Sequence, residues 1–425
     1  MKTAYQISSK GNTRHLARFL ASNSQVILPM VELIERSQLA VDQLLEDLGR
    51  GTLEAVLLIS AAGVAGESHR GRRGGEIVRH GQQRGVVPLS NRKLRVERPR
   101  LRLRAGGTGA EIEVPAYAAI QQDRSLGGKV LDTLMRCVST RNYEKILPEA
   151  CEAVGVSKSS VSREFIQASE EAYKRLCERR FDDLNIVVIY IDGMVFGEHH
   201  IVAAVGIDDQ GNKHVLGMVE GATENAAVVK SLLELLVERG VHAGVRRLFV
   251  IDGSKALRHA INALYGADNP VQRCRIHKVR NVLDHLPEEQ RPYAKLVMRA
   301  AFRQDADEGM KRLQELASSY EKRYPSAAAS LREGLTEMFT VARMGIPGAL
   351  SRCLVSTNLI ESPNAGVRLR TRRVTRWQGG SMVLRWTAAA FLATEKQFRR
   401  VSGYQHLWIL RTALHQNTAD TLRVA

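Results

Sequence analysis

Cysteines are few in this sequence of 425 residues, and no arrangement of them suggests a cross-link or a structural metal. Their spacing fits neither a disulfide framework nor a four-ligand zinc site, which needs two closely spaced ligand pairs. We therefore expect a protein of a reducing compartment, the cytosol. The five cysteines are Cys137, Cys151, Cys177, Cys274 and Cys353.

Long hydrophobic runs are also missing. The longest apolar stretch, Ala55–Ala65, is far short of the roughly 20 residues that span a bilayer. The N-terminus, MKTAYQISSKGNTRHLARF, is polar and basic and adjoins no apolar core, unlike a secretion signal. The sequence therefore predicts neither secretion nor insertion into a membrane.

Acidic residues are too few to balance the basic ones. The chain has 45 Asp and Glu against 62 Lys and Arg, which gives a formal net charge of +17. Such an excess favours a polyanionic partner, because basic side chains neutralise phosphates, and we expect nucleic acid rather than a membrane surface. With 44% apolar residues the chain is globular, and its length predicts two to four domains or lobes.

The N-terminal part combines helices with the most basic block of the chain. Residues 26–60 have apolar side chains at helical spacing, which indicates packing or oligomerisation. Residues 67–104 contain twelve Lys or Arg and three Glu. The segment RPRLRLRAGGTGAEIEVPAY then alternates on both sides of its glycines, which predicts a β-hairpin. The expected cross-strand pairs are Leu103 with Ile112, Leu101 with Val114, Arg104 with Glu111 and Arg102 with Glu113.

A helix-turn-helix is predicted within a helical region, residues 124–180. The segment AVGVSKSSVSR offers a glycine turn, a capping serine and a polar, basic helix start, whose side chains are suited to base edges and phosphates. An ordinary capped helix is the alternative interpretation. The candidate DNA contacts are Ser157, Lys158, Ser159, Ser160 and Arg163.

From Leu184 the pattern becomes rich in strands. NIVVIYIDG is a β-branched apolar run, HHIVAAVGID and KHVLGMVEG flank the loop DDQGN, and Glu224–Arg239 is an amphipathic helix. A strand at Arg247–Asp252, a helix at Lys255–Tyr265 and a short strand at Val271–Ile276 follow. Three antiparallel strands, a helix and a further strand-helix-strand unit are the order of the ribonuclease-H-like fold.

The remaining sequence predicts helices only. Residues 279–355 contain four prolines and no strand pattern, which indicates an all-helical insertion. Glu361 then opens another helix, and Met382–Phe398 is predicted to form the last long one. Within that region, Trp377 and Trp386 fit either base stacking or the core, and we expect the core.

Three carboxylates carry the strongest chemical signal: Asp192, Asp252 and Glu361. Each aspartate ends a predicted buried strand and precedes glycine, so adjacent strands would bring both to one sheet edge, where Glu361 would join them. Two-metal phosphodiester chemistry needs such carboxylates to hold two cations, and oxygen ligands select Mg²⁺ or Mn²⁺. Taken singly, each acid also fits a turn or a helix start.

At this point the chain resembles the mutator family of bacterial insertion-sequence transposases. The matching stretches include GVSKSSVSREF, YIDG, HVLGMVEGATENAAVVKSLLELLVERG, FVIDGSKALRHAI, QRCRIHKVRNVLDHLP and STNLIES. The resemblance implies that Asp192, Asp252 and Glu361 form an Asp-Asp-Glu triad that binds divalent metal. We expect two ions, either Mg²⁺ or Mn²⁺. The family's Cys-x-x-His pair falls on Cys274 and His277. We expect that pair to support the site rather than bind zinc, since no second ligand pair accompanies it.

Clusters of basic residues beside the carboxylates are predicted to bind DNA. The segment after Glu361 has Ser362 where many relatives have arginine, yet it is rich in arginine further on. On a helix Glu361 and Arg368 share a face, which would place a guanidinium beside the strand being cut. His199 and His200 lie near Asp192 in sequence, and we interpret both as surface or strand-packing residues. The predicted DNA contacts here are Arg273, Arg275, Lys278, Arg280, Arg368, Arg372, Arg373 and Arg376.

The fold class that follows is α/β: a ribonuclease-H-like mixed sheet with an all-helical insertion, preceded by a helical region, a β-hairpin and a helix-turn-helix. The expected domains are 1–65, helical; 66–122, basic segment and hairpin; 123–182, helix-turn-helix; 183–278, first part of the core; 279–355, insertion; and 356–425, completion of the core and C-terminal helices.

The expected function is that of a DNA transposase that binds terminal inverted repeats, frees a 3′-hydroxyl by hydrolysis and joins it to target DNA. The resemblance also implies a homodimer or higher assembly, because two ends must be held together. No membrane partner is expected, and the protein should be cytoplasmic, bacterial and associated with the nucleoid. Two alternatives stay open: a domesticated DNA-binding protein without catalysis, and a ribonuclease-H-like nuclease or resolvase.

Overall fold

The computed structural model describes residues 49–66, 76–89, 92–104, 111–121, 125–136, 158–221 and 226–423. They divide into two compact units. The first lies within Met1–Leu126 and Leu147–Ser157, and the second within Gly127–Ile146 and Lys158–Ala425. No helix among these residues is long and apolar enough to cross a membrane.

The first unit packs helices on a three-stranded antiparallel sheet with the order β1-β2-β3. A helix over residues 49–65 buries Leu57 and Ala61 against strand residues such as Val87 and Val96. The described part of the basic block is therefore largely sheet, for which no strand was predicted before the hairpin segment. The elements are β1 (Ile77–Leu89), β2 (Arg92–Leu103), β3 (Glu111–Ile112) and α3 (Pro115–Gln121).

The predicted hairpin is present, but its register differs from the prediction by two residues. Leu101, not Leu103, lies opposite Ile112, and Arg102 lies opposite Glu111. A shift by two keeps every side chain on the same face, so hydrophobic alternation cannot tell the two registers apart. Glu111 accepts from Arg100 and lies 3.5 Å from Arg102, so both arginines have a structural role here.

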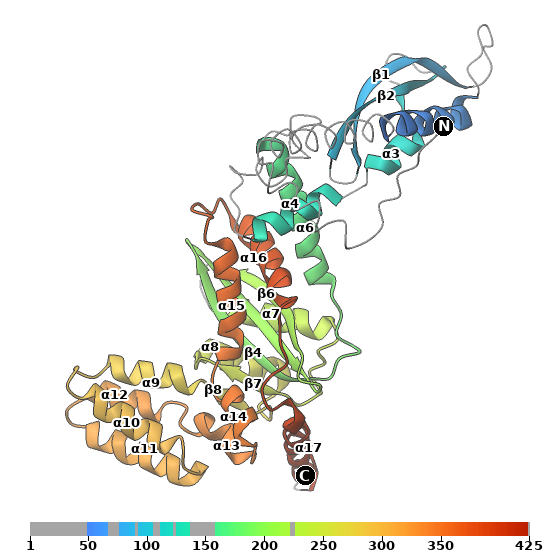
Figure 1. The fold of residues 1–425 in the computed structure, drawn as a ribbon. Helices are drawn as coiled ribbons and strands as arrows, with labels where there is room; N and C mark the ends of the chain where they lie inside the picture. Colours follow the sequence, from blue (N-terminus) through green and yellow to red (C-terminus); the bar gives the residue numbers. More distant parts are fainter. Residues whose placement is uncertain are drawn as a thin grey trace, which may run out of the picture. The chain divides into compact units, whose positions relative to one another are not determined.

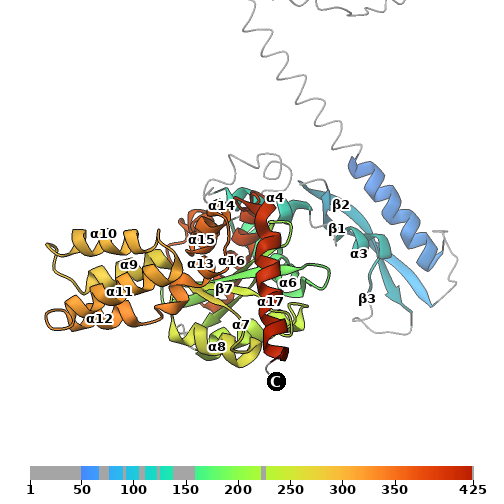
Figure 2. The same ribbon diagram turned by 90° about the horizontal axis from the view of Figure 1, so that it is seen from below.

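The second unit is built on a mixed five-stranded sheet with the order β6-β5-β4-β7-β8 (Figures 1 and 2). The pairs β4 with β5 and β5 with β6 are antiparallel, whereas β4 with β7 and β7 with β8 are parallel. All five predicted strands are present. They are β4 (Ile186–Phe196), β5 (His199–Asp208), β6 (Lys213–Gly221), β7 (Leu248–Ile251) and β8 (Val271–Arg273).

Helices cover both faces of this sheet. Because side chains alternate along a strand, Ile189 of β4 packs with one group of helices and Tyr190 with the other. The first group is α7 (Ala226–Glu238) and α8 (Lys255–Tyr265). The second group is α13 (Thr340–Arg343), α14 (Gly348–Leu354), α15 (Asn358–Thr371) and α17 (Leu407–Arg423). Helix α17 corrects the prediction that the helix at Met382–Phe398 is the last long one.

Helices α6 (Lys158–Glu178) and α16 (Gly380–Glu395) pack on each other beside β6, and α4 (Ser125–Met135) precedes them in the chain. Trp386 contacts Phe165 of α6 with ring centroids 4.3 Å apart and the rings tilted at 45°, and the ring of Trp377 lies 5.3 Å from that of Phe196. Both tryptophans are half-buried and packed against other aromatic rings, which favours packing over base stacking without placing them in the core. His199 is bonded to Glu220 of the neighbouring strand region at 2.5 Å, in line with its expected packing role.

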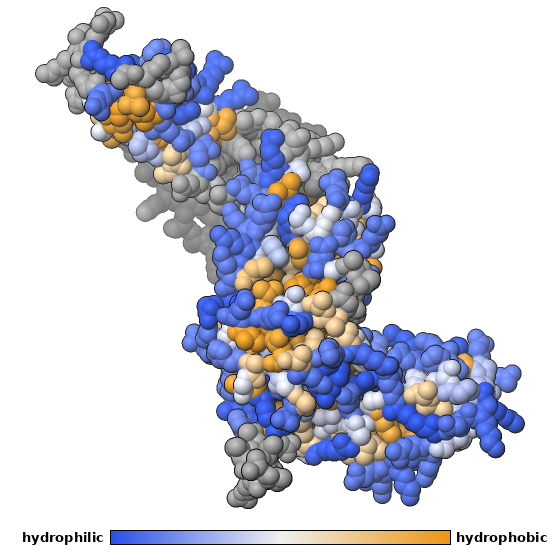
Figure 3. Space-filling model, turned by 180° about the vertical axis from the view of Figure 1, so that it is seen from behind, coloured by the Kyte–Doolittle hydropathy of each residue, from blue (hydrophilic) through white to orange (hydrophobic). Residues whose placement is uncertain are grey.

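Residues 275–343 form a helical insertion with a hydrophobic core of its own, which includes Met298, Leu313 and Phe339. Prolines open α10 and α12 rather than interrupting them, since a first-turn residue needs no hydrogen-bonded N–H. Hydrophilic residues cover most of the insertion's visible surface at the lower right of Figure 3. Its elements are α9 (Arg275–Asp284), α10 (Arg291–Ala301), α11 (Ala306–Tyr320), α12 (Pro325–Arg332), the 3₁₀ helix η2 (Thr336–Phe339) and α13.

One glycine of the insertion marks a close helix approach. A Cβ atom on Gly309 in α11 would lie 2.5 Å from both the Ala301 carbonyl oxygen and the Phe339 ring. Gly309→Ala should therefore destabilise the protein by about 1–3 kcal/mol, the usual cost of overpacking. Gly128→Ala in α4 is the matched control, because a Cβ there meets nothing within 4 Å. Equal urea-unfolding midpoints for the two variants would contradict this account.

Candidate active site

The two aspartates lie next to each other because of the register of two parallel strands. Tyr190 of β4 pairs with Val250 of β7, and each carboxylate is two residues further along its chain. With a side-chain period of two, Asp192 and Asp252 project to the same face as Tyr190 and Val250, which is the face covered by α15. The expected neighbouring strands are thus confirmed.

Asp192 does not end its strand as predicted. β4 continues to Phe196, and Asp192 pairs within it with Ala203 of β5. The glycine after Asp192 suggested a turn, but pairing with β5 holds the chain extended past the point where β7 ends. Asp252 does follow its strand directly, and its Oδ1 accepts the Ser254 N–H at 2.9 Å, where α8 begins.

Helix α15 brings a third carboxylate and an amide to this face. Glu361 lies in the first turn of α15, as predicted, and its Oε1 accepts the Thr357 hydroxyl at 2.9 Å. One turn later, Asn364 donates from Nδ2 to Oδ2 of Asp192 at 2.8 Å. Asn364 is 1% exposed, and its Oδ1 has no hydrogen-bond partner among the described residues.

Cys274 and His277 join the start of α9 to the start of α15. Cys274 is the N-cap of α9: its Sγ accepts the His277 N–H at 3.5 Å. The same sulfur accepts the backbone N–H of Thr357 at 3.4 Å and lies 3.4 Å from its hydroxyl oxygen. The His277 ring lies 3.7 Å from Glu361 through Nε2 and 3.4 Å from the Thr357 hydroxyl through Nδ1.

The pKa values of Asp192, Cys274 and His277 are each shifted by burial and by neighbouring groups of the site. Burial, and then the negative charge of Asp252, raise the pKa of Asp192 above its usual value. Burial alone would raise the pKa of the Cys274 thiol, but hydrogen bonds with His277 and Thr357 lower it. The interaction with Cys274, followed by the charges of Glu361 and Asp252, raises the pKa of His277.

The capping role of Cys274 leads to a prediction. Aspartate and serine accept N-cap hydrogen bonds as well as cysteine does, whereas alanine leaves the donors of His277 and Thr357 without an acceptor. We expect Cys274→Ala to cost about 1–2 kcal/mol of stability. Cys274→Asp and Cys274→Ser should retain most of it. Thermal unfolding of the three variants checks this, and a loss for Asp as large as for Ala would argue against capping.

Among the described residues, no group of three or more His, Cys, Asp and Glu side chains is arranged to hold a metal ion. The donor set nevertheless suits one, because two neighbouring carboxylates, for which no ion pair is found among the described residues, offer the oxygen ligands that Mg²⁺ selects. The orphaned Oδ1 of Asn364 lies beside them. The two aspartates therefore offer ligand atoms suited to a divalent cation. Glu361 lies on the same face but does not form a group of three with them.

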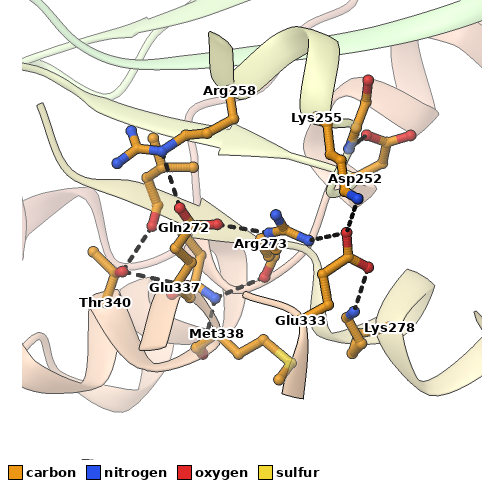
Figure 4. A network of polar contacts seen from close by, with 12 residues as sticks. Asp252, Lys255, Arg258, Gln272, Arg273, Lys278, Glu333, Glu337, Met338 and Thr340 are labelled. Atoms are coloured by element: carbon orange, nitrogen blue, oxygen red, sulfur yellow. Dashed lines mark hydrogen bonds and ion pairs between the residues drawn. The ribbon is translucent and has the colours of Figure 1, made fainter. Parts of the chain in front are cut away.

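Three basic residues predicted to bind DNA are structural instead. Arg273 is 6% exposed and its Nε donates to Glu337 at 2.6 Å; Lys278 is 2% exposed and donates to the Ser330 carbonyl. Figure 4 shows both side chains directed at Glu333 of the insertion. Burial and these partners leave no group free for phosphate, so the prediction is corrected for both.

Arg275 is corrected in the same way. Its guanidinium donates to the Met338 and Phe302 carbonyls and lies 4.8 Å from the Phe302 ring centre. Burial lowers the pKa of Arg275 to about 10. The residue therefore anchors the insertion rather than a phosphate.

The other predicted DNA contacts stay predictions. Arg280 is exposed on α9, and four arginines are exposed in and after the last turns of α15: Arg368, Arg372, Arg373 and Arg376. Arg163 is exposed on α6. The predicted helix-turn-helix lies largely outside the described residues: Ser157 is not among them, and only the backbone of Lys158, Ser159 and Ser160 is described, as the first turn of α6.

Two residues of the site were not found from the sequence: Thr357 and Asn364. Both could have been inferred from helix geometry, since Thr357 lies four residues before Glu361 and Asn364 three residues after it, on one face of the helix. If Glu361 belongs to the site, polar residues three or four positions away on the same helix face are expected to contact it too.

Comparison with known proteins identifies a family and several relatives. The family described as Transposase, Mutator family, matches residues 23–401. The transposase for insertion sequence element ISRM5 of Rhizobium meliloti is 28% identical over 300 residues, covering 68% of this chain and 73% of the relative. The transposase for IS256 in transposon Tn4001 of Staphylococcus aureus is 28% identical over 264 residues, covering 59% of this chain and 65% of that relative, slightly less than two thirds of its length.

A third relative is the transposase for insertion sequence element IS1081 of Mycobacterium tuberculosis. It is 27% identical over 307 residues, covering 69% of this chain and 72% of the relative. The family match spans both compact units and includes all three carboxylates described above. The chain therefore belongs to the Mutator family of transposases.

Proposed function

We propose that this chain is an Asp-Asp-Glu DNA transposase, which binds the terminal inverted repeats of its element, cleaves one strand and joins the freed 3′-hydroxyl to target DNA. The observation that carries the proposal is the strand register that sets Asp192 beside Asp252 on the face where α15 presents Glu361. Three antiparallel strands followed by two parallel ones, the order of a ribonuclease-H-like domain, support the same conclusion.

Asp192, Asp252 and Glu361 would hold the divalent cations, Mg²⁺ or Mn²⁺ and most simply two ions. When bound, such ions activate the attacking oxygen and stabilise the leaving one in an in-line displacement at phosphorus. The protein's own groups fix the carboxylates: Asn364 orients Asp192, Ser254 N–H orients Asp252, and Thr357 orients Glu361. Such preorganisation is the main contribution a protein makes to phosphoryl transfer.

DNA is held by charge in this proposal. Arg368 lies two turns after Glu361 on α15 and is exposed, so it can contact a phosphate of the strand being cut. Further positive charge follows at Arg372, Arg373 and Arg376. Because two element ends must be brought together, the active form is a homodimer or a higher assembly acting in the bacterial nucleoid.

The direct test is movement of an element in cells. A plasmid carries a marker between the DNA segments that flank this reading frame, and the protein is supplied from a second plasmid. Marker movement that requires the protein supports the proposal. Binding of the ends without cutting would favour a domesticated DNA-binding protein, and cutting of branched DNA or RNA without joining would favour a nuclease or resolvase.

Metal binding can be tested without any activity assay. Because the pKa of Asp192 is raised, its charged form is disfavoured in the folded, metal-free protein. Stability from this group therefore increases as the pH falls through the folded pKa towards the unfolded one, and is lost above it. We expect Asp192→Asn to raise the Tm of the metal-free protein at neutral pH, with a smaller gain in acid.

Mg²⁺ should reverse this order. A cation at about 100 times its Kd stabilises the folded wild type by about 2.7 kcal/mol, whereas the variant lacks one ligand and should respond less. Thermal unfolding with Mg²⁺ and with a chelator checks both parts. An identical Mg²⁺ response in the two proteins would rule out Asp192 as a ligand.

A further inference from the structure

A groove on the insertion, between α9 and α10, combines an apolar floor with a basic rim. It encloses about 450 Å³. One acidic residue, Asp284, lines it, against five basic ones. The floor consists of Ile276, Val279, Leu283 and Phe302, and the rim of Arg275, Arg280, Arg291, Lys295 and Arg299.

Three rim residues are available for a ligand. Arg280, Lys295 and Arg299 are exposed, and no ion pair is found for any of them within the described part of the chain. Arg275 and Arg291, in contrast, donate to backbone carbonyls and shape the groove. The available charge therefore lies on the two edges of the groove, with α9 contributing Arg280 and α10 the other two.

The floor of the groove exposes apolar side chains to solvent, which a site that only binds phosphates does not need. Ile276 is 43% exposed at the first turn of α9, and Phe302 is held by Phe339, with ring centroids 5.7 Å apart, and by Arg275. A ligand that matches both parts carries negative charge on a backbone and flat apolar groups beside it. Single-stranded nucleic acid has this combination, whereas the bases of a duplex are stacked inside and present their phosphates alone.

The groove and the candidate active site share one helix, α9. Ile276 and His277 are consecutive residues of α9, so this helix turns one flank to Glu361 and the adjacent flank to the groove. We propose that this groove binds unpaired nucleotides of the DNA strand next to the cleavage site. Their bases lie on the apolar floor, and their phosphates contact Arg280, Lys295 and Arg299. The inference rests on the proposed function and adds a single-strand subsite to it.

The test compares charge reversals of equal size in the full-length protein. The variant Lys295→Glu with Arg299→Glu changes the groove, and Lys322→Glu with Arg323→Glu changes an exposed turn between α11 and α12. Binding of a short single-stranded oligonucleotide is followed by fluorescence anisotropy at several salt concentrations. Circular dichroism and gel filtration check that both variants fold.

Loss of two phosphate contacts should make the slope of log affinity against log salt concentration shallower by about 1.4 for a single strand. The wild type should therefore gain about 25-fold more affinity than the groove variant when the salt concentration falls from about 1 M to about 0.1 M. The turn variant should lose much less, although its net charge is the same. A blunt duplex of the same length should show a smaller difference between the two variants. Equal losses for groove and turn variants with the single strand would overturn the proposal.

The floor is tested separately with Ile276→Ser. This variant should weaken binding of a normal oligonucleotide several-fold but not of one with abasic sites, which has phosphates and no bases. Equal effects on both probes would overturn base contact with the floor. Loss of poly-glutamate binding in the groove variant, with DNA binding intact, would identify a site for acidic peptides and refute the proposal.

These binding experiments use metal-free protein and no cleavage, so they are independent of the proposed reaction. A chain that moves no element can still show the groove effect, and failure of the groove effect leaves element movement untouched. The two results therefore distinguish failure of the subsite from failure of the transposase proposal.

Discussion

Asp252→Asn is expected to lower the rate of strand cleavage at an element end by about 10²–10³-fold, the loss typical when one preorganised contribution to the charge stabilisation of a transition state is removed. Asparagine keeps the oxygen that accepts the Ser254 N–H, so the turn into α8 should survive. The substitution thus removes one negative charge while retaining the local structure. Asp192→Asn and Glu361→Gln should behave alike, because each retains an oxygen acceptor for Asn364 or Thr357.

The measurement is the release of a 3′-hydroxyl end from a labelled duplex that carries an element end, with Mg²⁺ present. Asp268→Asn is the matched control, since this exposed aspartate lies in the loop before β8 and its side chain is outside the proposed site. Binding of the duplex should be unchanged in all four variants. Cleavage by Asp252→Asn at a rate near that of the control would remove Asp252 from the proposed triad.

Glu337→Ala should destabilise the protein by about 3 kcal/mol, because it leaves a buried arginine without its principal partner. Glu337 accepts from Arg273 at 2.6 Å and from Arg258 at 3.0 Å, and the Arg273 side chain is only 8% exposed. Glu333, 3.8 Å from Arg273, offers only partial compensation. We therefore expect the lower end of the range for a broken buried pair.

The control is an ion pair of the same kind on the surface. Arg332 and Glu321 are 44% and 56% exposed, so Glu321→Ala should cost at most about 1 kcal/mol. Urea unfolding at fixed pH and salt gives both values. Similar midpoints for the two variants would mean that the network in Figure 4 contributes no more than a solvated pair.

Local sequence patterns were sufficient to predict the five strands of the second unit's sheet and that its two aspartates lie on neighbouring strands. β-branched runs identify β4 and β7, and period-two alternation determines which face Asp192 and Asp252 share. The register of β2 with β3 was predicted wrongly because a shift by two residues preserves that alternation. The end of β4 was predicted wrongly for a different reason: Asp192 lies inside the strand because β4 pairs with β5, and its own neighbours in sequence do not indicate this pairing.

Long-range partners explain the other errors. Arg273, Arg275 and Lys278 form a basic cluster in the sequence, and phosphate binding was a reasonable interpretation of it. Their partners lie about sixty residues away, at Glu333, Glu337 and Met338, and no local pattern indicates them. Charge in a sequence therefore predicts a nucleic-acid surface only where burial leaves the side chains exposed, as at Arg368.

The chain that carries the helical insertion leaves the sheet after β8 and returns to it before α15, and these two points adjoin each other. Arg275 N–H donates to the Val355 carbonyl at 3.0 Å, and Cys274 contacts Thr357 beside it. Because the two crossing points touch, a connection that lies away from the sheet, such as the turn between α11 and α12, can lengthen without moving Asp252 or Glu361, and each doubling of a flexible loop costs only about 0.6 kcal/mol. The position is thus a natural grafting point, where evolution or design can exchange one accessory domain for another around an unchanged set of carboxylates.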